Sequence, residues 1–329
     1  MSEAPKTSTP IEIPIIGIKN FRSTCFANSV FQILCSQRAL IKYLKVVEPT
    51  TETPYTFALK KMLKPLLESK TPGIIRESID PPEEMRKIII DLQTESGQRQ
   101  MDAGEFYTTV INALHVESLK IQKPEETQEE DDDGWEEVGE KSKKISLRTE
   151  KSDGKSCVSE VFRGKTRMTT TTVDAKKKAN KAVFQDFYIF SVPLQKGKDC
   201  CKTTNECYNL ATSRRVEGNI VQTLSIEEFP KVLVLQFNRF IYDRVQLKVV
   251  KITDHVSFEE TLSLKVGKKS VNYKLSVVVE HRGNNIGRGH YVAYVRRGPN
   301  WFFCNDEQII KTDFTEVRNA MAYLLVYSN

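Results

Sequence analysis

GIKNFRSTCFANSVFQ, from Gly17 to Gln32, is the stretch of sequence that decides how this chain folds. It predicts a loop ending at Thr24, which would be the N-cap of a helix that begins at Cys25. A thiol in the first turn of a helix feels the positive end of the helix dipole, which favours the reactive thiolate. Because a free cysteine is more often a small buried apolar residue, Cys25 needs a nearby base before it can be called a nucleophile.

Length and composition indicate a large globular protein. The chain has 329 residues, 39% hydrophobic and 28% charged, as in folded domains rather than disordered or membrane chains. The net charge of +6 is modest, and no run of 18 apolar residues occurs, so we expect neither a nucleic-acid partner nor a membrane. The N-terminal residues lack the pattern of a secretory signal, and seven cysteines do not suggest a disulfide framework. The expected location is the cytoplasm, with the nucleus as a second location.

Helical periodicity dominates the first part of the chain and strand-like sequence the second. Helices are expected over 25–34, 57–67, a segment starting at Pro81-Pro82, and 103–119. Runs rich in β-branched and aromatic residues predict strands over 187–194, 232–240, 273–280, 290–297, 301–304 and 322–328. Helices followed by strands favour an α+β architecture.

Two segments are predicted to be disordered. Residues 1–13 form a polar tail, and an acidic insertion at about 120–155 has few apolar residues with which to fold. The insertion suggests a basic partner or a flap over the basic body, although a solvated loop is the simpler interpretation. The remainder of 14–329 is expected to form one folded domain.

His290 is the strongest candidate for the base. It follows a glycine-flanked run and opens a predicted strand, so it is expected to face a cleft between the helical and sheet parts. Asn305 or Asp306 follows the next strand, where either can orient the imidazole, although an ordinary exposed hairpin remains an alternative. His281 precedes the glycine-flanked run and is expected to line the same cleft. The chain has four histidines, and the other two are His115 and His255.

The cysteines after residue 199 are the only metal-site candidate in the sequence. Cys200, Cys201 and Cys207 cluster, but without a CxxC pair or a nearby histidine. Structural zinc usually requires four well-spaced ligands. We therefore expect no metal and no cofactor.

Three sequence blocks together resemble the ubiquitin-specific protease family of papain-like deubiquitinases. They are GIKNFRSTCFANSVFQ around Cys25, QMDAGEF from Gln100 to Phe106, and GHYVAYVRR with WFFCNDE and the terminal AYLLVY. VFRGK at 161–165 and FPKVLVLQFNRF at 229–240 match in order between them. The resemblance runs from about residue 14 to the C-terminus. It implies a papain-like cysteine protease fold, with a helical thumb, a palm and β-stranded fingers, and makes 14–329 the catalytic domain.

The resemblance implies roles for residues that match the family by position. Cys25 would be the nucleophile, His290 the general base and Asn305 the residue that orients it, with Asp306 assisting. Asn20 would supply the amide of the oxyanion hole, since a preorganised donor stabilises charge developing on a carbonyl oxygen. Asp102 and Glu105 match acids that hold the arginine-bearing tail of ubiquitin. The other residues expected to contact substrate are His281, Gly289 and Tyr291.

The sequence departs from the family pattern at two places. The family usually has a glycine and a small or amide residue before the Thr-Cys pair, where this chain has Arg22 and Ser23. Its fingers usually carry two CxxC pairs, which are missing here around 170–178 and 215–223, so the fingers are expected to fold without zinc. Together with DGWEEVGEKSKK at 133–144, this is most similar to the branch that includes ubiquitin carboxyl-terminal hydrolase ten.

The expected function is therefore that of a thiol-dependent deubiquitinase, which cleaves the isopeptide or peptide bond after the C-terminal glycine of ubiquitin. Its expected partners are ubiquitin, ubiquitinated proteins and a regulatory protein. One alternative is a catalytically weak ubiquitin-binding scaffold on the same fold, with Arg22 disturbing the catalytic loop. Another is a different Cys-His-Asp enzyme such as an acyltransferase, against which Asp102 and Glu105 argue.

Overall fold

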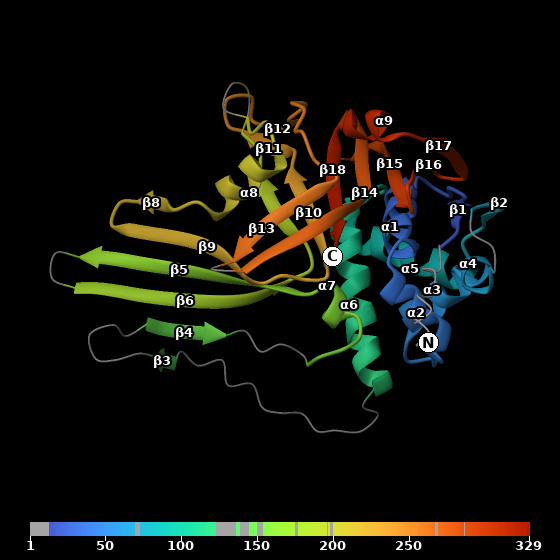
Figure 1. Ribbon diagram of the computed structural model, residues 1–329, viewed down its shortest axis with the longest axis horizontal. Coiled ribbons are helices and arrows are strands. Elements are labelled where there is room, and N and C mark those ends of the chain that lie inside the picture. The colour runs from blue at the N-terminus through green and yellow to red at the C-terminus, as the bar shows by residue number, and fades with distance from the viewer. Residues whose placement is uncertain are drawn as a thin grey trace, which may run out of the picture.

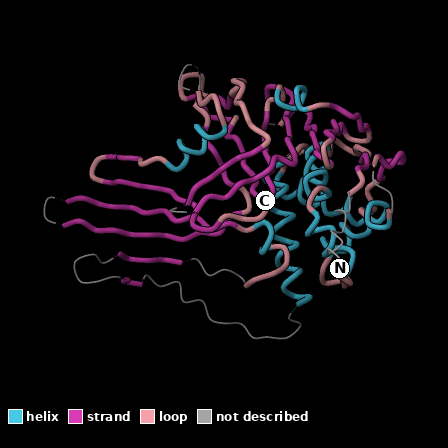
Figure 2. Tube along the Cα trace, in the orientation of Figure 1, coloured by secondary structure: helices cyan, strands magenta, loops and turns pink. Residues whose placement is uncertain are grey.

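The fold divides into a helical end, a central sheet and a set of long projecting strands (Figure 1). The computed structural model describes residues 13–69, 73–122, 136–138, 145–149, 154–174, 177–195, 197, 200–266, 269–285 and 287–329. Figure 2 shows that helices dominate one side of the molecule and strands the other, as the sequence predicts. These parts correspond to the expected thumb, palm and fingers.

The helical thumb is built from the first part of the chain. It contains α1 (Cys25–Cys35), α2 (Arg38–Val46), α3 (Pro54–Met62), α4 (Lys64–Glu68), α5 (Glu83–Ser96) and α6 (Ala103–Gln122). The single helix expected over 57–67 is two helices, because Pro65 cannot continue a hydrogen-bond ladder and instead lies in the first turn of α4. Three short helices follow later in the chain: α7 (Ser159–Phe162), α8 (Thr204–Thr212) and α9 (Phe314–Arg318).

Helix α1 is buried along its whole length. It contacts α6 and the strands of the central sheet. Phe106 of α6 packs edge-on against Phe26 and Phe31, with ring centroids 5.3 and 5.8 Å away. Such close packing fixes the position of the N-terminal end of α1, where Cys25 lies.

The palm is a sheet whose strands run in the order β17-β16-β15-β14-β18-β10-β7, with β13 paired to β14. Side chains alternate between its two faces, as strand geometry requires. On β10, Val232 and Val234 belong to the core beneath the thumb, whereas Leu233 and Leu235 belong to the core on the opposite face. The strands are β7 (Phe190–Pro193), β10 (Val232–Asn238), β13 (Thr261–Val266), β14 (Lys269–Asn285), β15 (Arg288–Arg297), β16 (Asn300–Asn305), β17 (Gln308–Thr312) and β18 (Ala322–Ser328).

The fingers are a second sheet, with strand order β3-β4-β6-β5-β9-β8. Its strands are β3 (Glu136–Val138), β4 (Ile145–Thr149), β5 (Gly164–Asp174), β6 (Lys177–Phe187), β8 (Arg215–Glu217) and β9 (Ile220–Glu228). Two smaller pairs complete the fold. β1 (Ile15–Ile18) runs parallel to β2 (Ile74–Ile79), and β11 (Phe240–Asp243) forms a hairpin with β12 (Lys248–Lys251).

Where the structure describes them, parts of the segments predicted to be disordered form helix or strand. Helix α6 continues to Gln122, and β3 and β4 lie inside the acidic insertion, with β4 paired in parallel to β6. Backbone pairing therefore orders short pieces whose composition offers few apolar groups. Ile13 is only 8% exposed, and the rest of the predicted tail lies outside the described residues. No helix among the described residues is long and apolar enough to cross a membrane.

Candidate active site

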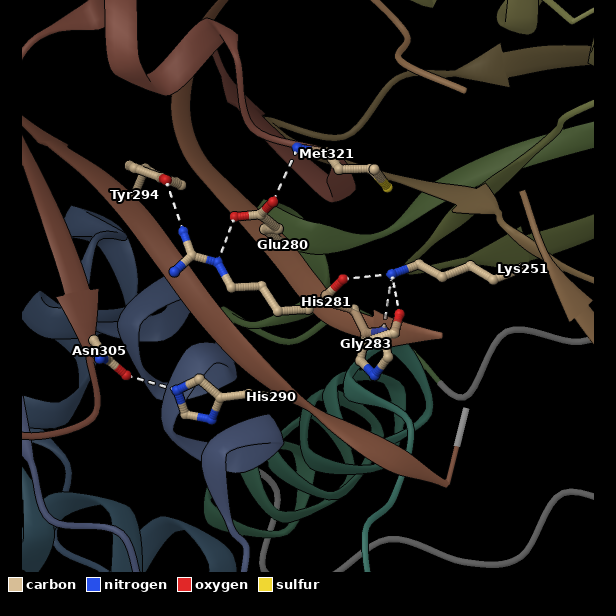
Figure 3. Close-up of polar contacts among 9 residues, drawn as sticks. Lys251, Glu280, His281, Gly283, His290, Tyr294, Asn305 and Met321 are labelled. Carbon is tan, nitrogen blue, oxygen red and sulfur yellow. Dashed lines mark hydrogen bonds and ion pairs between the residues drawn. The ribbon is translucent and has the colours of Figure 1, made fainter. Parts of the chain in front are cut away.

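Three of the predicted residues meet where α1 abuts the palm. Cys25 is the first residue of α1 and is 3% exposed, while His290 lies near the start of β15 and Asn305 ends β16. Because β15 and β16 are antiparallel neighbours, the start of one lies beside the end of the other. His290 Nε2 is 2.6 Å from Asn305 Oδ1 (Figure 3). The sheet thus assembles an imidazole and its orienting amide next to a helix-terminal thiol.

The surroundings of His290 favour its protonated form. Its pKa is raised to about 9, first because the ring hydrogen-bonds to the Cys25 sulfur. Burial opposes this shift, whereas the bond to Asn305 and the negative charges of Cys25 and Asp306 support it. Protonated, the ring has donors for both Cys25 and Asn305. This is the arrangement expected of a thiolate–imidazolium pair.

The loop before Cys25 is held by Asn20 and Thr24. Thr24 is the N-cap of α1 by position, but its hydroxyl does not cap the helix, which corrects the expected role. Instead Thr24 Oγ1 accepts a hydrogen bond from Phe21 N and donates one to Asn20 Oδ1, and Thr24 N donates to the same oxygen at 2.9 Å. These bonds curl the loop back on itself and direct the amide nitrogen of Asn20 away from it.

Arg22 and Ser23 take an unusual backbone conformation in this loop. Their φ angles are +49° and +67°, in the left-handed region that glycine adopts more readily than other residues. Both residues are exposed. Arg22 therefore takes, where the family usually has glycine, a conformation that glycine adopts more readily, at a cost in backbone strain.

Asp306 connects the turn after β16 to the loop before α1. Its carboxylate accepts hydrogen bonds from Asn20 Nδ2 and Asn28 Nδ2, each at 2.8 Å, and its carbonyl oxygen accepts one from Ile18 N at 3.0 Å. One hydrogen of the Asn20 amide nitrogen is thus held by Asp306, and a second is left for a substrate oxygen. Asn28 was not among the sequence-predicted residues, although it lies one helical turn after Cys25.

Gln100 is a second residue that sequence reasoning missed. It lies just before α6, within the block that contains Asp102, and its side chain reaches both Cys25 and Gly289. The only indication in the sequence was its position, two residues before the predicted site residue Asp102.

Asp102 and Glu105 line a cavity of about 620 Å³ between α6 and the palm. Asp102 Oδ1 accepts hydrogen bonds from the backbone nitrogens of Gly104 and Glu105 at 2.8 and 3.0 Å, which caps α6. Its carboxylate also accepts from Tyr291 and Tyr323. Glu105 is exposed at the cavity. Their predicted contact with a substrate's basic residue remains a prediction.

His281 and Tyr291 do not face the cleft, contrary to expectation. Each is 1% exposed, and their rings pack against each other with centroids 4.7 Å apart. Burial and the charges of Lys251 and His290 lower the pKa of His281 to about 4, so its ring is neutral. Lys251 Nζ donates to the carbonyl oxygens of His281 and Gly283 at 2.6 and 2.7 Å (Figure 3). These buried residues support the strand that carries His290.

Cys200, Cys201 and Cys207 are buried in the core on the face of the palm sheet opposite the thumb. Burial raises the pKa of the Cys200 and Cys207 thiols, which disfavours the thiolate that a metal needs. Across the part of the chain that the structure describes, no group of three or more His, Cys, Asp or Glu residues is placed to hold a metal ion.

The sequence model of the ubiquitin carboxyl-terminal hydrolase family matches residues 16–327, and the chain belongs to this family. It is 27% identical to ubiquitin carboxyl-terminal hydrolase 2 of Bos taurus, over 95% of this chain and 55% of the relative. It is 24% identical to ubiquitin carboxyl-terminal hydrolase 10 of Rattus norvegicus, over 97% of this chain and 48% of the relative. The chain therefore spans about half the length of the curated relatives it matches.

The fold is also similar to that of solved structures. The Ubp8-Sgf11-Sgf73-Sus1 SAGA DUB module matches with a TM-score of 0.73 and 23% identity, over 98% of this chain and 70% of the solved chain. The same module with a substituted Ubp8, bound to monoubiquitin, matches with a TM-score of 0.72 and 21% identity, over 98% and 72%. The predicted α+β, papain-like fold is confirmed.

Proposed function

We propose that this protein is a thiol-dependent hydrolase that cleaves the isopeptide or peptide bond after the C-terminal glycine of ubiquitin. One observation carries the proposal: Cys25, at the first turn of α1, lies close enough to His290 to raise the pKa of its imidazole, and His290 Nε2 is 2.6 Å from Asn305 Oδ1. Membership of the ubiquitin carboxyl-terminal hydrolase family supports the substrate class.

The reaction follows from this arrangement in two stages. The Cys25 thiolate attacks the carbonyl carbon of the terminal glycine, and protonated His290 gives its proton to the leaving amine. The negative oxygen of the tetrahedral intermediate is stabilised by Asn20 Nδ2, which Asp306 holds in place. The resulting thioester is hydrolysed by a water molecule that His290 deprotonates. Release of the carboxylate restores the thiolate and the protonated imidazole.

Substrate recognition is assigned to the cavity beside α6. Glu105 is exposed there, and Asp102 lines the same cavity, so it presents acidic groups to a basic residue near the scissile bond. A solved structure similar in fold is described as bound to monoubiquitin, which supports the same class of ligand for this chain. Its description also includes Sgf11, Sus1 and Sgf73 alongside Ubp8, which supports the proposal that a regulatory protein partner exists here.

A catalytically weak ubiquitin-binding scaffold is the alternative. The left-handed Arg22 and Ser23 favour it, since a strained loop before the nucleophile is a site where activity can be lost. Against it, the bonds from Thr24 and Asp306 hold Asn20 in place despite Arg22.

The proposed location is the cytoplasm, with the nucleus as a second location, and fluorescence microscopy of the tagged full-length protein tests it.

The proposal is tested with ubiquitin whose C-terminus carries a fluorophore. We expect the wild-type protein to release the fluorophore and Cys25→Ala to release none while still binding ubiquitin. Cys157→Ala is the matched control, because this half-buried cysteine lies outside the site. Release that persists in Cys25→Ala would contradict the proposal, and ubiquitin binding without any release by the wild type would support the scaffold.

A further inference from the structure

We propose that Gln100 is a positioning residue that ties the nucleophile to the strand carrying the base. This inference rests on the proposed function, in which Cys25 and His290 act as a pair. Gln100 is 6% exposed, so its carboxamide must find partners inside the protein. Its partners lie on α1 and β15, the two elements that carry Cys25 and His290.

The carboxamide of Gln100 makes three hydrogen bonds at once. Its Nε2 donates to Cys25 Sγ at 3.2 Å and to Gly289 O at 2.9 Å, and its Oε1 accepts from Gly289 N at 3.1 Å. A primary amide has two hydrogens to donate, so both donor bonds can form together. The side chain thus pairs with Gly289 on both backbone groups, as a neighbouring strand would.

Gly289 is clamped from the opposite side as well. A Cβ atom on Gly289 would lie 2.1 Å from His281 Nε2 and 2.7 Å from Arg282 O. The backbone therefore passes through a narrow gap between the buried His281 ring and Gln100. Because Gly289 immediately precedes His290, these contacts fix the backbone position of His290 and therefore the position of its imidazole.

The bond to sulfur gives Gln100 a second effect. A hydrogen bond to an ionised group is stronger than one to a neutral group, so an N–H donor at 3.2 Å favours the thiolate over the thiol. The titratable groups around the sulfur are His290 from β15 and, through its charge on His290, Asp306 from the turn after β16. Gln100 adds a neutral donor that retains its effect across the working pH range.

Gln100→Met tests the proposal, because methionine has a similar length but no donor or acceptor of comparable strength. Gln32→Met is the matched control: Gln32 is 2% exposed in α1, and its carboxamide donates to Ile16 O and not to Cys25. The first readout is the rate of Cys25 alkylation by iodoacetamide as a function of pH, which requires no ubiquitin. Failure of the inference is thereby separated from failure of the proposed function.

In Gln100→Met we expect the alkylation midpoint to move upward, because the thiolate loses a charge-assisted hydrogen bond. With the ubiquitin–fluorophore substrate, kcat should fall by about tenfold with little change in KM. Gln32→Met should keep the wild-type midpoint even if it lowers stability. A wild-type midpoint together with an unchanged kcat in Gln100→Met would overturn the proposal.

A second measurement covers the case in which Gln100→Met fails to fold. In the wild-type protein, the side-chain amide NMR signals of Gln100 should shift with pH at the same midpoint as alkylation. In Cys25→Ala this shift should disappear, because the sulfur is absent. An identical pH response in both proteins would contradict a bond between Gln100 and the thiolate.

Discussion

At the scale of residues, the charge of His290 depends on its neighbour Cys25. The hydrogen bond to the Cys25 sulfur is the largest contribution that raises the pKa of His290 to about 9, and it outweighs burial, which acts in the opposite direction. A histidine whose pKa is raised on folding stabilises the protein at low pH. This contribution is complete below the ordinary pKa of about 6.5 and is lost as pH rises through about 9.

Cys25→Ala should therefore lower the pKa of His290 to near or below its ordinary value. An NMR titration of the His290 ring protons measures this directly. Equal pKa values of His290 in the two proteins would show that the sulfur does not control the imidazole.

Backbone strain at Arg22 gives a second prediction at this scale. Arg22→Gly should raise the free energy of unfolding by about 1 kcal/mol, because glycine accepts the left-handed conformation without the steric cost of a Cβ atom. Arg22→Ala is the control, since it removes the exposed side chain but keeps the Cβ atom, and it should leave stability unchanged. Urea denaturation measures both. Equal stabilisation by the two substitutions would attribute the effect to the arginine side chain instead.

At the scale of elements, the junction of β14 and β15 positions the base. Lys251 ties the β11–β12 hairpin to the carbonyl oxygens of His281 and Gly283, and Gln100 ties Gly289 to Cys25. Side chains from other elements thus hold the backbone of both strands close to their junction, just before His290. Small changes in its backbone should act on catalysis through the position of the imidazole.

Gly289→Ala should reduce kcat by at least about a hundredfold, because the added methyl group would overlap the His281 ring and push His290 from its place. Gly287→Ala is the matched control two residues away, where a Cβ atom meets only Asn285 Oδ1 at 3.8 Å. Steady-state hydrolysis of the ubiquitin–fluorophore substrate compares the two. Similar activities of the two variants would contradict the claim that tight packing of Gly289 against His281 positions His290.

The sequence predicted the elements better than the contacts between them. Apolar periodicity located α1 and α6, because local side-chain spacing alone defines a buried helical face, and Pro81-Pro82 located the start of α5. The bonds from Gln100 to Gly289 join residues 189 positions apart, and such a contact depends on how the elements pack. The same reason explains why His281 was expected in the cleft: a strand position specifies a face of the sheet, but not what covers that face.

At the scale of the whole molecule, two cores share the palm sheet, and the fingers extend from it on paired strands (Figure 1). The fingers contain the long antiparallel pairs β5–β6 and β5–β9, which provide extended backbone hydrogen bonding. The described residues contain no cluster of metal-binding side chains that would replace such pairing.

Removing metal ions should leave the protein unaffected. We expect the same melting temperature and the same ubiquitin–fluorophore hydrolysis before and after treatment with a zinc chelator, because strand pairing and apolar packing need no ion. Differential scanning calorimetry and the hydrolysis assay check the two quantities. A chelator-dependent loss of either, restored by added zinc, would mean that the fold requires a bound metal.

The central claim is that Cys25 attacks the C-terminus of ubiquitin. The most direct measurement is covalent capture by ubiquitin that carries a thiol-reactive electrophile at its C-terminus, followed by mass spectrometry to locate the modified residue. The chain has seven cysteines, so the position of the adduct is informative. The account predicts a single adduct at Cys25 that is lost when His290 is replaced by alanine. An adduct at another cysteine, or none with a folded protein, would contradict it.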